Sequence, residues 1–319
     1  MTHLDTRLLP SDGQPLISVI LPTYNGSGRI GPAIRSVLEQ KGNVALELLV
    51  VDDGSTDDTA GVVARNFDDP RVRVLRIEPN GGTYAAQNAG LRSARGKYVT
   101  FIGDDDEWAP SKIMRQVDIL EGDPGVALVH TSMIDVFPDG SRRVRRVPRG
   151  ADRYRANLWH DCICSSTVMI RRDVLDAFGG FDESMRAFGD WDLWTRVLGQ
   201  YRTASIDEPL AIIHLRPGSI QRGSLDSFAT WYRHALSKRH DELVRYGLLP
   251  RAEARYHYAL AAKLHQRGAN SAARRSARLS LRSSLNAEAV ALTALTLLPR
   301  GLAFRGRLAL RSLISIIRI

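Results

Sequence analysis

Two groups of aspartates each follow a short apolar run of this chain. They are Asp52 and Asp53 after the run 46–51, and Asp104, Asp105 and Asp106 after the run 98–102. Carboxylates gathered in one cleft repel one another by about 1–4 kcal/mol per pair at 4 Å, so they need a cation, hydrogen-bond donors or protonation. Oxygen ligands favour a hard divalent ion, Mg²⁺ or Mn²⁺, which commonly bridges to substrate phosphates. The aspartates therefore indicate metal-assisted phosphate chemistry.

Strands must bring these aspartates together. Short apolar runs predict strands at 16–21, 46–51, 72–77 and 98–102, and helical patterns lie between them at 30–40 and 83–94. Alternating strands and helices predict an α/β domain with a mainly parallel, twisted sheet flanked by helices. Ligands bind outside the carboxyl ends of the strands of such a sheet, so the aspartates should meet the residues that follow the first strand. Among these, the ring of Tyr24 could stack on a base.

The second half of the chain has a more mixed pattern. Expected strands cover 126–135, 144–147, 163–170 and 204–215, and expected short helices cover 173–178 and 191–198. From about Leu225 the pattern changes to long helices rich in Ala, Leu and Arg, among them 270–285, 287–298 and 302–319. We therefore expect a polar N-terminal tail at 1–15, an α/β domain at 16–222 and an α-helical C-terminal region at 223–319.

The composition is that of an ordinary globular protein and excludes several classes. Two cysteines cannot build a disulfide framework or a thiolate zinc site. The first 16 residues lack the apolar core of a secretory signal, and no uncharged stretch reaches the roughly 20 apolar residues of a membrane span. A net charge of +9 suits nucleic acid, an anionic membrane or a phosphorylated ligand, but no nucleic-acid motif is present. We expect a cytoplasmic protein without a nucleic-acid partner.

Four motifs in order along the chain resemble those of family 2 glycosyltransferases. They are Pro22-Thr23-Tyr24-Asn25, Val51-Asp52-Asp53-Gly54-Ser55-Thr56-Asp57, Asn88-Ala89-Gly90 with Gly96-Lys97-Tyr98, and Asp104-Asp105-Asp106-Glu107-Trp108. The resemblance covers about residues 16–220. It implies a GT-A-like fold with a Rossmann-like nucleotide-binding half, and a UDP-, GDP- or dTDP-linked sugar as donor.

The resemblance also implies roles for single residues at the donor side. The donor-binding residues would be Pro22, Tyr24, Asn25, Asp53, Asn88, Asp104 and Asp105, with Tyr24 on the nucleobase and Asp53 hydrogen-bonded to it. Asp105 would bind the Mn²⁺ or Mg²⁺ that holds the diphosphate. The family's metal motif is Asp-x-Asp, and its first Asp falls on Gly103 here. Asp104 would then take over the contact to the ribose or the metal.

A catalytic base is implied by a further segment, Gly189-Asp190-Trp191-Asp192-Leu193-Trp194. The family carries Glu-Asp before a helix, and its Asp is taken as the base of inverting members. That position is Asp190 here, with Gly189 in place of Glu. An acceptor hydroxyl must lose its proton as it attacks the anomeric carbon, which a positioned carboxylate can accept. The alternative role for Asp190 is that of a helix cap.

Two further features leave alternatives open. Many members of the family carry Arg-x-His before Pro-Gly-Ser, and this chain has the two residues in exchanged order, as His214 and Arg216. The resemblance implies that either of them would meet the diphosphate. His214 would be a metal ligand or a structural residue. The basic amphipathic pattern 302–319 fits a helix on an anionic membrane surface, at its cytoplasmic face, or one packed on protein.

These observations favour a metal-dependent, inverting glycosyltransferase. Its acceptor would be a hydroxyl of a glycan, a lipid-linked molecule or a small molecule. A sugar nucleotidyltransferase is one alternative, but it would need a basic phosphate loop after the first strand, where residues 25–29 offer Arg29 alone. A non-catalytic nucleotide-sugar-binding or scaffold protein is the other, and such a protein has no need of Asp190 as a base.

Overall fold

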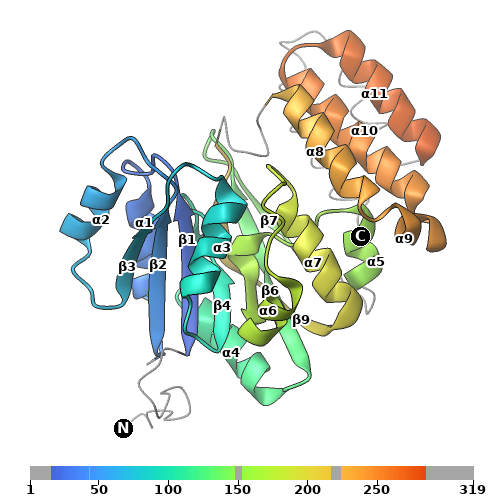
Figure 1. Cartoon of the computed structure of the whole chain (residues 1–319). Coiled ribbons are helices and arrows are strands. Elements are labelled where there is room, and N and C mark those ends of the chain that lie inside the picture. Colours follow the sequence, from blue (N-terminus) through green and yellow to red (C-terminus); the bar gives the residue numbers. More distant parts are fainter. Residues whose placement is uncertain (1–15, 43, 148–152, 217–223, 285–319) are drawn as a thin grey trace. The chain divides into compact units, whose positions relative to one another are not determined.

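The computed structural model describes residues 16–42, 44–147, 153–216 and 224–284. The chain divides into two compact units, Met1–Tyr154 with Cys162–Ser219 and Arg155–Asp161 with Ile220–Ile319. Within these ranges every strand belongs to the first unit, and the described part of the second unit is helical (Figure 1). The expected tail 1–15 and the expected helices 287–298 and 302–319 lie outside the described residues.

Nine strands of the described residues form one sheet. They are β1 (Ile17–Thr23), β2 (Leu46–Asp52), β3 (Val72–Arg76), β4 (Tyr98–Phe101), β5 (Glu107–Trp108), β6 (Val126–Val136), β7 (Arg142–Arg145), β8 (Val168–Arg171) and β9 (Arg202–His214). Their order is β3-β2-β1-β4-β8-β6-β9-β5, with β7 beside β6. The first four are parallel, and Figure 1 shows β3, β2 and β1 side by side in blue. The expected α/β fold, with parallel strands in this half of the sheet, is thereby confirmed.

The other half of the sheet is mixed. β8 pairs antiparallel with both β4 and β6, and β5 pairs antiparallel with β9. β9 runs parallel to β6 along one edge, and β7 pairs antiparallel with the second half of β6 on the other. The expected strand 144–147 begins two residues earlier, at Arg142. The expected strand 163–170 is shorter, because a 3₁₀ turn, η2 (Ser165–Thr167), comes before β8.

Helices cover both faces of the sheet. In the first unit they are α1 (Ile30–Leu38), α2 (Thr59–Asn66), α3 (Thr83–Ser93), α4 (Lys112–Gly122), α6 (Arg172–Phe178) and α7 (Gly189–Gln200). Alternate side chains of β1, namely Ile17, Val19 and Leu21, share a buried cluster with α1, α2 and α4. On the opposite face, Ile20 lies against Gly90 of α3. Strands buried on both faces explain why the runs read as continuously apolar.

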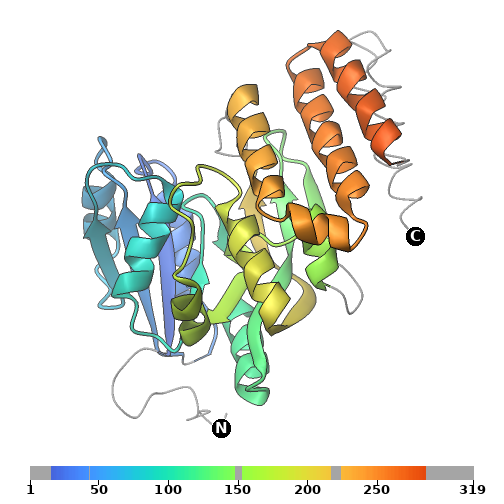
Figure 2. The same ribbon diagram turned by 45° about the vertical axis from the view of Figure 1, so that its right-hand side comes forward.

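The described part of the second unit packs helices through small and aromatic side chains. Its helices are α8 (Leu225–Ser237), α9 (His240–Arg245), α10 (Leu249–Gln266) and α11 (Asn270–Ser283), together with most of α5 (Arg153–Trp159). α10 and α11 lie side by side in Figures 1 and 2. Ala261 of α10 and Ala277 of α11 share a buried cluster. Within the described residues, the helices include none that combines the length and the apolar character needed to cross a bilayer.

Candidate active site

Three loops at the carboxyl ends of β1, β2 and β4 are tied together by hydrogen bonds. The amide of Asp53 donates to the carbonyl of Thr23 at 2.9 Å, and the Thr23 hydroxyl donates to Asp104 at 2.7 Å. The amide of His214, at the end of β9, donates to Asp106 at 3.3 Å. The structure therefore brings the aspartates of both groups to one edge of the sheet.

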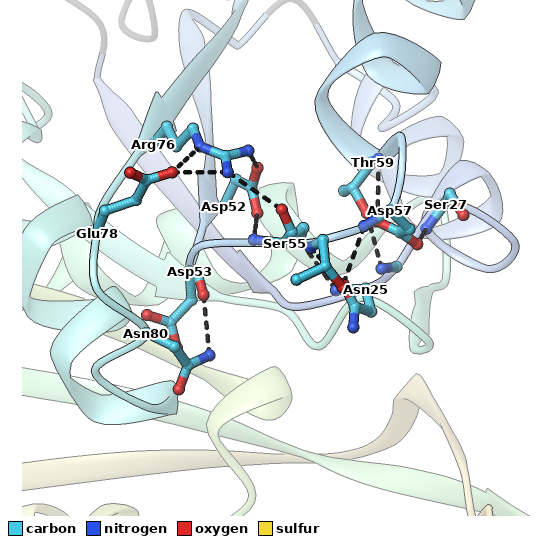
Figure 3. A network of polar contacts seen from close by, with 12 residues as sticks. Asn25, Ser27, Asp52, Asp53, Ser55, Asp57, Thr59, Arg76, Glu78 and Asn80 are labelled. Carbon is cyan, nitrogen blue, oxygen red and sulfur yellow. Dashed lines mark hydrogen bonds and ion pairs between the residues drawn. The ribbon is translucent and has the colours of Figure 1, made fainter.

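The Asp53 carboxylate is held in place by the loop between β3 and α3. Its two oxygens accept hydrogen bonds from the amides of Gly81 and Gly82, each at 2.8 Å. Asn80 donates its side-chain amide to the Asp53 carbonyl at 2.9 Å (Figure 3). The carboxylate is almost wholly buried. A carboxylate fixed in this way is a preorganised acceptor at the sheet edge.

Asp52 differs from its neighbour in every contact. Its carboxylate is completely buried, accepts from the Ser55 amide at 2.9 Å and pairs with Arg76 at 3.0 Å (Figure 3). Arg76 in turn pairs with Glu78 at 2.7 Å. Asp52 therefore supports the loop after β2.

Asn25 joins the loops that follow β1 and β2. Its side-chain oxygen accepts from the backbone amide of Thr56 at 2.8 Å, and its backbone amide donates to the Ser55 hydroxyl at 2.9 Å (Figure 3). Its φ of 50° is left-handed, a conformation that asparagine tolerates better than most residues. The carboxamide oxygen of Asn25 is therefore bound by the protein's own backbone.

The aspartates before α2 lie outside that helix. The helix begins at Thr59, whose amide donates to Asp57 at 3.1 Å, and the Ser27 amide donates to the same carboxylate at 3.1 Å (Figure 3). Asp57 therefore links two loops and precedes the first turn.

Pro22 and Tyr24 lie beside these loops. Pro22 is a partly buried residue of β1, whereas the Tyr24 side chain is 44% exposed. Arg29 fixes the backbone here by donating to the Tyr24 carbonyl at 2.8 Å. An exposed ring on a fixed backbone offers a flat apolar face to a ligand.

Asp104 is neutralised by a cation of the chain. Arg29 donates to both of its oxygens, Nε to Oδ1 at 3.0 Å and Nη2 to Oδ2 at 2.7 Å. With the Thr23 hydroxyl also bound to Oδ2, three hydrogen bonds orient this carboxylate. The Asp104 carboxylate is therefore well occupied by protein partners.

Asp105 is the more accessible acid of the group. It pairs with Arg216 at 3.2 Å, and its side chain is 25% exposed. Burial, with the nearby Asp104 charge, raises the pKa of Asp105. A cation bound there would relieve both effects, because it favours the charged form.

Asp106 points into the protein. It accepts from the Ser166 hydroxyl at 2.6 Å, and burial together with the Asp105 charge raises its pKa to about 7. Ser166 also anchors the loop by accepting from the Gly103 amide at 3.1 Å. Nothing in the sequence pattern marks Ser166, which lies about sixty positions away.

His214 pairs with a carboxylate of the neighbouring strand. Its Nε2 lies 2.9 Å from Oε1 of Glu107, and both side chains are partly exposed. Within the described residues, no three His, Cys, Asp or Glu side chains are arranged to hold a metal ion.

Asn88 connects α3 to the loop after α6. Its side-chain nitrogen donates to the Phe181 carbonyl and to Glu183, and its oxygen accepts from the Phe181 amide, all at 2.9 Å. The side chain is nearly buried. Every polar atom of this carboxamide thus has a protein partner.

Asp190 lies in the first turn of α7. Its Oδ1 accepts from the Trp191 amide at 3.0 Å and faces the Tyr84 hydroxyl at 3.4 Å. Burial raises the pKa of Asp190, and the Arg145 charge opposes that effect. A carboxylate with a raised pKa is a better proton acceptor near neutral pH.

Asp190 and Asp106 both affect the pKa of the Cys164 thiol. Burial raises the pKa of the Cys164 thiol to about 12, and both carboxylates add to the effect while Arg145 opposes it. The two acids and Arg145 therefore surround one region of the first unit. The sequence pattern had not indicated either Arg145 or Tyr84, which come from β7 and α3.

The arrangement combines three chemical elements. Asp53 is an acceptor with fixed direction, Asp105 is an accessible carboxylate between Asp104 and Arg216, and Asp190 is a partly buried carboxyl group with a raised pKa. Such a site can bind a polar planar group and an anion with its cation, and can accept a proton.

Comparisons with known proteins show what this chain is similar to. Residues 18–179 match the model of glycosyl transferase family 2. The succinoglycan biosynthesis protein ExoO of Rhizobium meliloti (strain 1021) is 30% identical over 229 residues, spanning 66% of this chain and 64% of that protein, which is less than two thirds of its length.

Solved structures share the fold. S. aureus TarS 1-349 in complex with UDP-GlcNAc matches with a TM-score of 0.58 and 17% identity, over 88% of this chain and 90% of that chain. The mannosyltransferase PcManGT from Pyrobaculum calidifontis, in complex with GDP-Man and Mn²⁺, matches with a TM-score of 0.57 and 24% identity, over 88% and 79%. These likenesses show the GT-A fold.

Proposed function

The chain belongs to glycosyl transferase family 2, and from this premise we propose that it transfers a sugar from a nucleotide-sugar donor to a hydroxyl acceptor, with inversion and with the help of a divalent cation. One observation carries the proposal. A single sheet edge gathers the fixed acceptor Asp53 and the accessible Asp105, and the adjoining region holds the Asp190 carboxylate.

The donor is proposed to lie along the edge of β1, β2 and β4. The exposed ring of Tyr24 suits a nucleobase, and Asp53 would accept a hydrogen bond from it. Similar folds are known with UDP-GlcNAc and with GDP-Man, which supports a nucleotide sugar as the donor class. Asn25 and Asn88 act in this proposal by shaping the loops, because the Asn25 side-chain oxygen and both polar atoms of the Asn88 carboxamide bind the protein.

The residues present fit a divalent cation in one way. Asp105 would hold it together with the donor's diphosphate, since Mg²⁺-type sites often use one or two carboxylates plus phosphates. Asp104 would contribute less to such a site, because Arg29 already binds both of its oxygens. When bound, the cation would offset the negative charge that develops on the leaving diphosphate.

Asp190 is proposed to accept the proton of the acceptor hydroxyl. The acceptor oxygen forms its bond to the anomeric carbon while the bond from that carbon to the diphosphate oxygen breaks. The hydroxyl proton passes to the Asp190 carboxylate, and the nucleoside diphosphate leaves. Attack from the side opposite the leaving group inverts the configuration of the anomeric carbon.

The test combines donor binding with turnover. We expect Asp190→Asn to lower kcat by about 10²–10⁴-fold, the usual contribution of a general base, while donor binding persists. Binding is measured as thermal stabilisation by UDP-, GDP- and dTDP-sugars with Mn²⁺, Mg²⁺ or EDTA, where a ligand at 100 times its Kd adds about 2.7 kcal/mol. Turnover is measured as nucleoside diphosphate release, and NMR of the product reports its anomeric configuration.

Two further variants sharpen this test. Asp105→Ala should abolish the part of the stabilisation that depends on the metal, and Asp118→Asn, at an exposed position of α4, should match the wild type. Undiminished turnover in Asp190→Asn would refute the mechanism. Absence of any nucleotide binding would instead favour the scaffold alternative.

The second unit is proposed to bring the enzyme to an anionic membrane surface, at its cytoplasmic face. α11 carries four arginines and no acid, and Arg275, Arg278 and Arg282 are exposed beside Leu279. Each such cation contributes about 1 kcal/mol near an anionic surface. Sedimentation with phosphatidylglycerol vesicles should therefore exceed that with phosphatidylcholine vesicles. Equal sedimentation with both would refute this part of the proposal.

A further inference from the structure

The first residue of α7 has an unusual partner. Phe188, which precedes the helix, offers no side-chain cap, and its φ of 65° is left-handed. The amide of Gly189, which has no partner within the helix itself, donates instead to the Tyr84 hydroxyl of α3 at 2.8 Å. Tyr84 therefore caps a helix to which it does not belong.

This contact fixes the direction of the next hydrogen bond. The Tyr84 hydroxyl oxygen accepts from the Gly189 amide, and the same hydroxyl donates to Oδ1 of Asp190, 3.4 Å away. Oδ1 also accepts from the Trp191 amide at 3.0 Å. Both contacts hold the same oxygen of the carboxylate.

The fit also depends on the absence of a side chain at Gly189. A Cβ added there would lie 2.8–2.9 Å from three carbons of the Tyr84 ring, closer than real Cβ contacts allow. The ring has little room to retreat, because it is 8% exposed and stacks on Phe181 with ring centroids 5.6 Å apart. Phe181 is itself packed edge-on against Phe101 and Trp194.

We propose that Tyr84 is a positioning residue for Asp190: its hydroxyl holds Oδ1 so that Oδ2 receives the acceptor proton, and Gly189 is the residue that makes room for it. This inference rests on the proposed function of Asp190. It gives a physical reason for the glycine that replaces the acidic residue expected before Asp190. The phenol occupies the space and supplies the hydrogen bond.

The hydroxyl has a consequence for the pH dependence of the reaction. The titratable groups that face Asp190 from other elements include Tyr84 of α3, Arg145 of β7 and Cys164 before η2. Tyr84 and Arg145 both lower the pKa of Asp190 against the effect of burial. A hydrogen bond to the charged form lowers a carboxyl pKa, so removing it raises that pKa. The acid limb of the rate profile should then move to higher pH.

The decisive variant is Tyr84→Phe, which keeps the ring and its stacking. We expect kcat to fall by about 10- to 100-fold at neutral pH, with the donor KM within about twofold of the wild type. The loss should shrink as the pH rises, because more of the altered Asp190 then ionises. A purely structural role of the hydroxyl would lower the melting temperature without moving the pH profile.

Tyr98→Phe is the matched control. Its hydroxyl is also part of a polar contact, to Glu121 at 2.9 Å, at the start of β4 and away from the proposed site. This control should keep the wild-type kcat and pH profile, whatever it does to stability.

A second pair of variants tests the steric part. Gly189→Ala should lower kcat, because the new methyl group must displace the Tyr84 ring. In the background of Tyr84→Ala the ring is gone, so Gly189→Ala should cost little more. Fully additive losses would overturn the steric argument.

The outcomes separate this inference from the proposed function. Full turnover in Asp190→Asn would show that Asp190 is not the base and would refute the proposed mechanism. Loss of turnover in Asp190→Asn, with an unchanged kcat and pH profile in Tyr84→Phe, would overturn only the role of Tyr84.

Discussion

Each aspartate at the sheet edge has a different set of partners. Asp52 supports a loop through Ser55 and Arg76, Asp104 is bound by Arg29, and Asp53 is cradled by two amides. Identical side chains thus differ in charge balance and access. The protein partners of each carboxylate determine whether its oxygens can still bind a ligand.

At this scale we predict a donor-binding defect in Asp53→Asn. The asparagine side chain has only one acceptor oxygen for the two backbone amides of Gly81 and Gly82, so it must turn and lose its fixed direction. Donor affinity measured by calorimetry should fall by tenfold or more. Asp69→Asn is the control, because Asp69 also accepts a backbone amide, from Arg71 at 2.9 Å, but at the other end of β3. Equal donor affinity in both variants would contradict the prediction.

From strand patterns alone, single residues could be placed where they lie next to a strand end. Asp53 and Asp105 follow apolar runs, so their place at the edge follows from the strands. Tyr84 is 106 positions from Asp190, and no periodicity signals that contact. The partners that orient the acids come from such distant contacts, which one sequence does not reveal.

Elements were predicted well where burial leaves a continuous apolar run. The strands 46–51 and 72–77 match β2 and β3 to within one residue. β5 has only two residues and exists because β9 pairs with it, so no local pattern marks it. The 3₁₀ turn before β8 was also missed, since Ser166 is held there by Trp108, whose ring nitrogen donates to its carbonyl at 2.8 Å.

The approach of α3 to the sheet gives an element-scale prediction. A Cβ at Gly90 would lie 2.6 Å from Ile20 and 3.2 Å from Val51, so Gly90→Ala should lower the free energy of unfolding by about 1–3 kcal/mol. Gly122→Ala, also helical, meets nothing within 4 Å and should raise it by up to about 1 kcal/mol. Urea unfolding measures both values. Changes of the same sign would show that helix propensity outweighs this packing.

The stability of the whole molecule should depend on His130 in β6. Burial lowers its pKa to about 3, against about 6.5 in an unfolded chain. Between these values the unfolded state binds a proton that the folded state rejects, so stability falls as the pH falls below about 6.5, by up to about 1.4 kcal/mol per pH unit. His130→Leu should remove this contribution.

Urea unfolding at roughly pH 4.5 and pH 7.5 checks the prediction. The difference in unfolding free energy between the two should be smaller in His130→Leu than in the wild type. His234→Leu, at an exposed position of α8, controls for the substitution itself. An unchanged difference in His130→Leu would show that other groups set the acid sensitivity.

The second unit takes part of its structure from the middle of the chain. Arg155–Asp161 belongs to it, with Arg155 over the ring of Tyr246 at 4.6 Å and Arg251 over that of Trp159 at 5.4 Å. On a ribosome that adds about 5–20 residues per second, Trp159 therefore emerges on the order of 5–20 s before Arg251. Until then Leu158, fully buried in the finished protein, lacks its later neighbours. In a nascent chain paused in this interval, the segment Arg155–Asp161 would lack the cation–π partners that it has in the finished protein.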